Sequence, residues 1–150
     1  MAGELPSMTL KAIGIVRSEI KQPSRQDCKE IVSDIIIDSS LTEALDNLDD
    51  FSHIIVLYWI HLATNKQVRI RVRPMARKEL PLLGLFSTHS PHRPNPVGKA
   101  TVRLLQRQGN VLRVKGLDAI DGTPVIDIKP YIPGYDSVAD ARVPPWMTRR

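Results

Sequence analysis

Residues 99–117 read KATVRLLQRQGNVLRVKGL. The stretches 99–106 and 111–117 are rich in aliphatic and β-branched residues separated by polar ones, which is typical of β-strands. Between them lie Gly109 and Asn110, which are residue types that tight hairpin turns prefer. The stretch therefore predicts a β-hairpin, and it places the chain among β proteins.

Further strands are expected on both sides of this hairpin. They cover residues 10–17, 31–38, 53–61, 67–73, 83–87 and 125–129. The sequence Ser40-Leu41-Thr42-Glu43 has the spacing of a capping box and predicts one short helix over residues 40–48. No G-x-G-x-x-G pattern follows a strand, so a dinucleotide-binding α/β fold is not expected. About seven strands at short spacing predict a barrel or a sandwich.

The composition fits one compact domain. The chain has 150 residues, of which 42% are hydrophobic and 25% are charged. The longest apolar run, 54–60, is too short to cross a bilayer, and the first residues lack the pattern of a secretory signal. Cys28 is the only cysteine, which suits a reducing cytoplasm. Lys and Arg exceed Asp and Glu by 21 − 16 = 5, which permits a polyanionic partner such as RNA.

A proline-rich stretch, residues 88–98 (THSPHRPNPVG), is the first candidate site. Its prolines stiffen the loop, and rigid loops that carry polar side chains are what ligand sites require. Histidines His89 and His92 are three residues apart, but a loop gives that spacing no common face, so we expect no metal. A metal hydrolase that uses these two histidines remains an alternative.

Two further groups of residues are candidates. Residues 117–131 (LDAIDGTPVIDIKPY) place three carboxylates, Asp118, Asp121 and Asp127, around one turn. Residues 67–73 alternate apolar and basic side chains, so the arginines share one predicted strand face. This face is either a phosphate track or a solvated surface.

The motifs RPNPVG (93–98) and DGTPVIDIKPY (121–131), in this order and at this separation, are highly specific together. With them, residues 10–136 resemble the TrmO family, also called TsaA-like. The resemblance implies a mainly β fold, a single-sheeted barrel of about seven strands with one or two short helices, followed by a tail over 137–150. It also implies a homodimer that binds S-adenosylmethionine near the dimer interface and methylates N6 of threonylcarbamoyladenosine next to the anticodon in tRNA.

The resemblance also assigns site residues. Cofactor contacts are expected from Arg25, Gln26, Asp27, His61, Leu62, His89, Lys99, Leu117, Asp118 and Asp121. The catalytic base is expected to be His92 or Asp118, and the sequence leaves this choice open. Contacts to the substrate and the RNA are expected from Arg69, Arg71, Arg73, Arg93, Asn95 and Lys129.

Two departures from the family pattern matter. Many relatives have Thr-Arg-Ser where this chain has Thr88-His89-Ser90, and histidine carries only partial charge at neutral pH. Longer bacterial relatives carry an additional C-terminal domain, whereas here only residues 137–150 follow the barrel region. These departures keep a second hypothesis open, that of a cofactor-binding regulatory or interaction module without catalysis.

Overall fold

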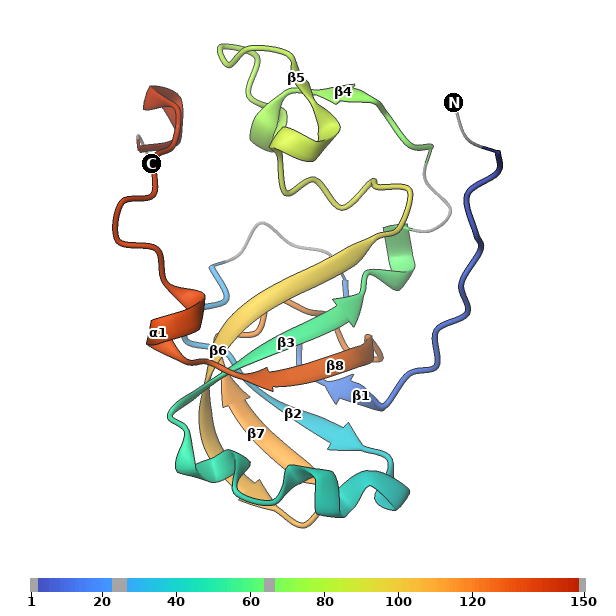
Figure 1. Cartoon of the computed structure of the whole chain (residues 1–150), viewed down its shortest axis with the longest axis vertical. Coiled ribbons are helices and arrows are strands. Elements are labelled where there is room, and N and C mark those ends of the chain that lie inside the picture. The colour runs from blue at the N-terminus through green and yellow to red at the C-terminus, as the bar shows by residue number, and fades with distance from the viewer. Residues whose placement is uncertain (1–2, 23–26, 64–66, 149–150) are drawn as a thin grey trace.

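The computed structural model describes residues 3–22, 27–63 and 67–148. Six antiparallel strands close into one barrel (Figure 1), which confirms the mainly β, single-sheeted prediction. In spatial order they are β1 (Gly14–Arg17), β2 (Val32–Ile37), β7 (Val111–Lys115), β6 (Val97–Gln108), β3 (His53–Trp59) and β8 (Pro124–Pro130), which pairs again with β1.

The barrel encloses the hydrophobic core. Side chains alternate between the two faces of each strand, so every second residue points inward. Val16, Ile35, Ile54, Leu112 and Val125 are all fully buried and come from five different strands. Because these strands belong to one closed sheet, their inward side chains form a single core.

The hairpin predicted from residues 99–117 is confirmed as β6 and β7. Gly109 lies in its turn at a φ of +61°, a conformation in which glycine has no steric penalty. The pairing shifts register between Leu104 and Gln106, which marks a bulge in the long strand β6. β6 begins two residues earlier than predicted, at Val97, directly after the proline-rich loop.

The predicted helix at 40–48 is wrong in type. The chain instead forms two 3-10 turns, Ser39–Leu45 and Leu48–Asp50, separated by Asn47 at a φ of +68°. The cap is Asp38, whose carboxylate accepts a hydrogen bond from the Ser40 amide at 3.2 Å. A left-handed residue interrupts helical winding, so one continuous α-helix does not form here. The α-helix of the described residues is one turn, α1 (Pro133–Asp136).

The predicted strand at 67–73 is also largely wrong. Only β4 (Arg71–Val72) is extended and paired, with β5 (Leu83–Gly84), and residues 85–87 form a 3-10 turn instead of continuing the strand predicted over 83–87. This small sheet lies outside the barrel (Figure 1). Ile70 is 81% exposed, so the alternation does not bury an apolar face and gives the strand nothing to pack on. We call residues 67–96 the arm.

No helix among the described residues has the length and apolar character needed to cross a membrane.

Candidate functional site

Several predicted site residues meet at one end of the barrel, where β3 finishes and β6 begins. His61 and Leu62 lie in a 3-10 turn just after β3, at His61–Ala63. The amide of Ile60 donates a 2.8 Å hydrogen bond to the carbonyl of Pro96, which holds this turn against the proline-rich loop. Lys99 is exposed on β6, where it pairs with Leu57 of β3. The structure therefore brings His61, Leu62 and Lys99 to the same rim.

Tyr58 connects this rim to the turn at 117–121. It pairs with Gly98 across the β3–β6 ladder, and its hydroxyl donates a 2.9 Å hydrogen bond to the carbonyl of Asp118. A Cβ atom at Gly98 would lie only 2.3 Å from Cε2 of the Tyr58 ring, so only glycine leaves room for the ring. The two candidate stretches, 88–98 and 117–131, are thus joined through Tyr58, which belongs to neither.

Asp118 is held by a second contact, from Cys28. The Cys28 thiol donates a hydrogen bond to Oδ1 of Asp118, with a sulfur–oxygen distance of 3.4 Å. Burial, assisted by the neighbouring Asp118 carboxylate, raises the pKa of the Cys28 thiol from 9.0 to about 11. Burial also raises the pKa of Tyr58 to about 12, so both groups stay protonated and remain donors at neutral pH. Asp118 itself is exposed, while Leu117 beside it is fully buried.

Cys28 should therefore react slowly with alkylating reagents. With a pKa near 11 rather than 9.0, the thiolate fraction at pH 8 falls by about 100-fold, and thiolate is the reactive form. We expect iodoacetamide to modify the folded chain at least about 100-fold more slowly than the urea-unfolded chain, as followed by mass spectrometry. Equal rates in the two states would contradict this description of Cys28.

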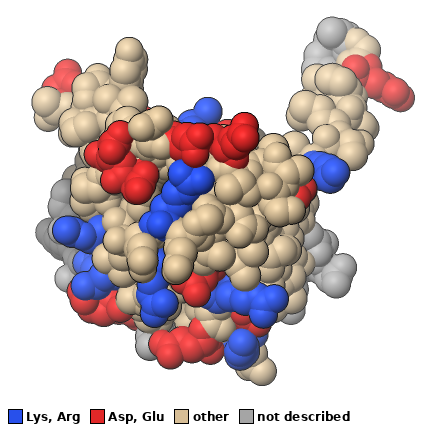
Figure 2. Space-filling model, turned by 90° about the horizontal axis from the view of Figure 1, so that it is seen from below, with Lys and Arg blue, Asp and Glu red and all other residues tan. Residues whose placement is uncertain are grey.

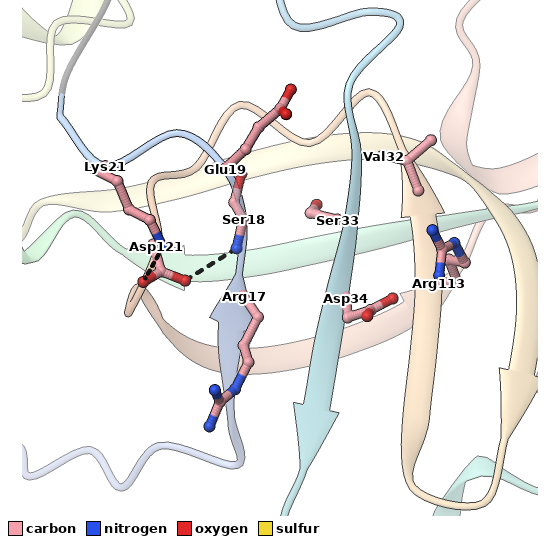
Figure 3. A pocket seen from close by; sticks show the side chains of 9 residues that line it. All are labelled: Arg17, Ser18, Glu19, Lys21, Val32, Ser33, Asp34, Arg113 and Asp121. Atoms are coloured by element: carbon pink, nitrogen blue, oxygen red, sulfur yellow. Dashed lines mark hydrogen bonds and ion pairs between the residues drawn. The ribbon is translucent and has the colours of Figure 1, made fainter.

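Asp121 ties the same turn to the segment after β1 (Figure 3). Its carboxylate accepts hydrogen bonds from the Ser18 amide at 3.0 Å and from Lys21 Nζ at 2.9 Å. These two donors hold the pKa of Asp121 below its usual value. The carboxylate lines a cavity of about 320 Å³ between β1, β2 and β7. The lining of this cavity also includes both basic side chains, such as Arg17 and Arg113, and acidic ones, Glu19 and Asp34. Here Asp121 positions the turn, because both of its oxygens are engaged.

Two predicted cofactor residues, Arg25 and Gln26, lie outside the described residues. Their neighbour Asp27 is exposed, and its carboxylate accepts a hydrogen bond from the Lys29 amide at 3.0 Å.

A larger cavity, of about 1,070 Å³, lies between the arm and the C-terminal segment. His89 and His92 line it together with Arg69 and Arg73, and Asp118 does not. Nδ1 of His92 is buried without a hydrogen-bond partner among the described residues. The two candidate bases are thus placed differently, His92 in this cavity and Asp118 on the turn held by Tyr58 and Cys28.

Arg93 braces the proline-rich loop. Its Nη1 donates hydrogen bonds to the carbonyls of Thr88 at 2.7 Å and Ser90 at 3.2 Å. Its guanidinium carbon also lies 5.6 Å from the centroid of the Phe86 ring, a cation–π contact. Asn95 is exposed, and its backbone carbonyl accepts a hydrogen bond from the Val97 amide at 2.7 Å. These contacts keep the loop rigid.

The predicted arginine row divides in the structure. Arg69 and Arg73 line the larger cavity, and Nη1 of Arg73 donates a 2.7 Å hydrogen bond to the carbonyl of Leu80. Arg71 lies in β4 and is exposed, but it does not line that cavity. A regular strand face of three guanidinium groups, as predicted from the alternation, is therefore wrong.

Lys129 and the three aspartates are also distributed differently from the prediction. Lys129 lies on β8 with its Nζ 3.6 Å from Oδ2 of Asp127. Asp127 lines a separate cavity beside the 3-10 turn Ser39–Leu45, so it does not join Asp118 and Asp121 around one site. On the face seen from below, basic and acidic residues are interspersed (Figure 2), so that face carries no continuous basic track.

The described residues contain no group of three or more His, Cys, Asp and Glu side chains that could hold a metal ion. Sequence reasoning missed Tyr58 and Trp146, which lines the larger cavity. Tyr58 lies within an apolar strand and looks like a core residue, and Trp146 is an isolated aromatic residue in an irregular tail. Neither residue stands in a local sequence pattern that would distinguish a site residue from one that only packs against its neighbours.

Comparisons with known proteins show the family to which the chain belongs. The family model for the tRNA-methyltransferase O N-terminal domain matches residues 17–137. A probable S-adenosyl-L-methionine-binding protein of Methanothermobacter thermautotrophicus is 45% identical over 133 residues, which is 86% of this chain and 93% of the relative. A protein of the same description from Archaeoglobus fulgidus is 45% identical over 139 residues, covering 89% of this chain but only 37% of the relative.

A mouse tRNA (adenine(37)-N6)-methyltransferase is 43% identical over 94 residues, which is 63% of this chain and 22% of that protein. The crystal structure of TrmO from Pseudomonas aeruginosa superposes with a TM-score of 0.75 at 34% identity, covering 93% of this chain and 62% of that one. Several relatives are thus considerably longer than the matched region. The chain belongs to the TrmO family, whose N-terminal domain its barrel represents.

Proposed function

We propose that this protein is an S-adenosylmethionine-dependent methyltransferase that acts on N6 of threonylcarbamoyladenosine next to the anticodon in tRNA. The observation that carries the proposal is the family match over residues 17–137, together with a relative named as a tRNA (adenine(37)-N6)-methyltransferase. Relatives named as S-adenosyl-L-methionine-binding proteins support the cofactor. The net charge of +5 is compatible with an RNA partner.

The rim of the barrel offers the groups that this cofactor needs. When bound, S-adenosylmethionine supplies an electrophilic methyl group on a sulfonium. Lys99 provides an exposed cation suited to its carboxylate, and Asp118 provides an exposed carboxylate suited to a hydroxyl or ammonium group. Tyr58 and Cys28 already hold Asp118 in place, so little conformational entropy is lost there when the cofactor binds. Arg25, Gln26, Asp27, His61, Leu62, His89, Leu117 and Asp121 complete the proposed contacts.

Methyl transfer from a sulfonium is an in-line displacement, so the protein contributes mainly by orienting its reactants, an effect worth about 7–11 kcal/mol in favourable cases. The carbamoyl group makes the N6 proton more acidic than in adenosine, so a modest base suffices. Of the two candidate bases, His92 is the better placed, because it lines the larger cavity, whereas the Asp118 carboxylate lies outside that cavity and accepts a hydrogen bond from Cys28. Arg69 and Arg73 supply positive charge for the substrate.

We also propose a cytoplasmic location and a division of the chain into a barrel unit over 10–136 and a tail over 137–150.

We further propose a homodimer with the cofactor near its interface. Three large apolar side chains of the arm, Ile70, Leu82 and Phe86, are exposed by more than half and would be covered by a second copy. A monomer in sedimentation velocity at micromolar concentration would contradict the dimer.

The decisive experiment incubates the full chain with methyl-labelled S-adenosylmethionine and tRNA that contains threonylcarbamoyladenosine. We expect label in that nucleoside after digestion, and none in a matched tRNA that lacks the modification. Calorimetry in parallel measures cofactor binding. Intact cofactor binding without transfer would contradict the enzyme and favour the non-catalytic module, for which His89 in place of the family's arginine is the motivating feature.

A further inference from the structure

We infer that the C-terminal segment 143–147 and the arm together form the binding cavity for the target nucleotide, with Trp146 stacking on its base. This inference rests on the proposed function, because it names where the RNA substrate of the same enzyme binds. The arm contributes Gln67, Arg69 and residues 72–76 and 87–92, and the tail contributes Val143, Pro144, Trp146 and Met147. The two segments are more than 50 residues apart in the sequence and meet at this cavity.

The size of the cavity fits a nucleotide with a bulky substituent. Its volume of about 1,070 Å³ lies just above the roughly 300–1,000 Å³ that is usual for ligand sites. A purine nucleotide that carries threonylcarbamoyl on N6 is a large ligand, and a cavity of this size has room for it. The smaller cavity beside Asp121, at about 320 Å³, lies at the lower end.

The charge of the cavity also favours an anionic ligand. Its described lining holds Arg69, Arg73, His89 and His92 but no Asp or Glu. A nucleotide carries phosphate, and the threonyl group adds a carboxylate, so the ligand's charge complements this lining. S-adenosylmethionine carries two positive groups, a sulfonium and an ammonium, and one carboxylate. Its net charge is therefore positive and does not complement this lining. The lining therefore favours the nucleotide over the cofactor as the main occupant of this cavity, with His89, which is also a proposed cofactor contact, where the two ligands adjoin.

Trp146 has the position that base stacking requires. It lies in the 3-10 turn Pro145–Thr148 and is half-buried, so part of the ring faces the cavity. The amide of Met147 donates a 2.9 Å hydrogen bond to the carbonyl of Pro144, which fixes the turn that presents the ring. Stacking on an aromatic side chain tolerates any base identity and suits an unpaired anticodon-loop nucleotide.

The test compares W146A and W146F with Y135A, which removes an exposed aromatic side chain of the same C-terminal region that does not line the cavity. Fluorescence anisotropy measures binding of an anticodon stem-loop RNA that contains threonylcarbamoyladenosine, and calorimetry measures S-adenosylmethionine affinity. We expect W146A to weaken RNA binding by about tenfold or more, and W146F and Y135A by less than about threefold. Cofactor affinity should not change in any variant.

Two results would overturn the inference: RNA binding by W146A equal to that of the unaltered chain, or a parallel loss of cofactor affinity, which would place the cofactor in this cavity. If W146A does not fold, the W59F variant provides a second measurement, because it leaves Trp146 as the only tryptophan. Stacking predicts that the RNA quenches its fluorescence, and unchanged fluorescence at saturating RNA would refute it. Tryptophan-dependent RNA binding without methyl transfer by the unaltered chain would refute the proposed activity alone.

Discussion

Replacing Gly98 with alanine is expected to lower the free energy of unfolding by about 3 kcal/mol and to weaken S-adenosylmethionine binding strongly. The new Cβ would lie 2.3 Å from Cε2, 2.4 Å from Cζ and 2.9 Å from Cδ2 of Tyr58. The ring cannot move aside freely, because its hydroxyl is bonded to the carbonyl of Asp118. Relief of the clash therefore displaces either the start of β6 or the turn that carries Asp118. Urea denaturation and calorimetry measure the two effects.

Two variants control this prediction. Gly84→Ala adds the same methyl group where nothing lies within 4 Å and where φ is −61°, so it should leave stability and binding nearly unchanged. In a Tyr58→Ala background the clash has no partner, so adding Gly98→Ala should cost little beyond the Tyr58 substitution alone. If Gly98→Ala costs as much in that background as in the unaltered chain, the contact with Tyr58 is not the cause.

Replacing Leu112 with alanine is expected to cost about 2–5 kcal/mol of stability, because it removes a fully buried side chain and leaves a cavity. Leu112 lies on β7 opposite Ile35 of β2, inside the single core. For a chain of this size the loss corresponds to a fall in Tm of about 2–4 °C per kcal/mol. Calorimetry should show one transition, since the core residues of all six strands form one cluster.

The matched control for Leu112→Ala is Leu105→Ala on the neighbouring strand. Leu105 is 43% exposed and lies at the bulge of β6, so the same truncation should cost well under 1 kcal/mol. Comparable losses at the two positions would contradict the description of the barrel interior as the stabilising core.

The sequence predicted those elements whose signals are local. The hairpin at 99–117 carries its own turn residues and alternation, and the strand at 53–61 is apolar on both faces, so neither depends on knowledge of the rest of the chain. The strand at 67–73 failed because alternation stabilises a strand only where a core and a pairing partner exist, and only Arg71 and Val72 have a partner strand. The helix at 40–48 failed because Asn47 is left-handed, and no spacing rule reveals that.

Residue types and their order were thus sufficient to predict a mainly β fold, either a barrel or a sandwich, because strand propensity and turn residues act locally. The two linked motifs then indicated the family, and the resemblance to that family implied the barrel. Contacts between distant residues required the folded chain. Tyr58 reaches Asp118 sixty positions away, Cys28 reaches the same carboxylate across ninety, and Trp146 meets His92 only at the cavity between tail and arm. Each depends on barrel closure and on where irregular segments run over its surface, which follow from the packing of the whole molecule rather than from any single stretch of it.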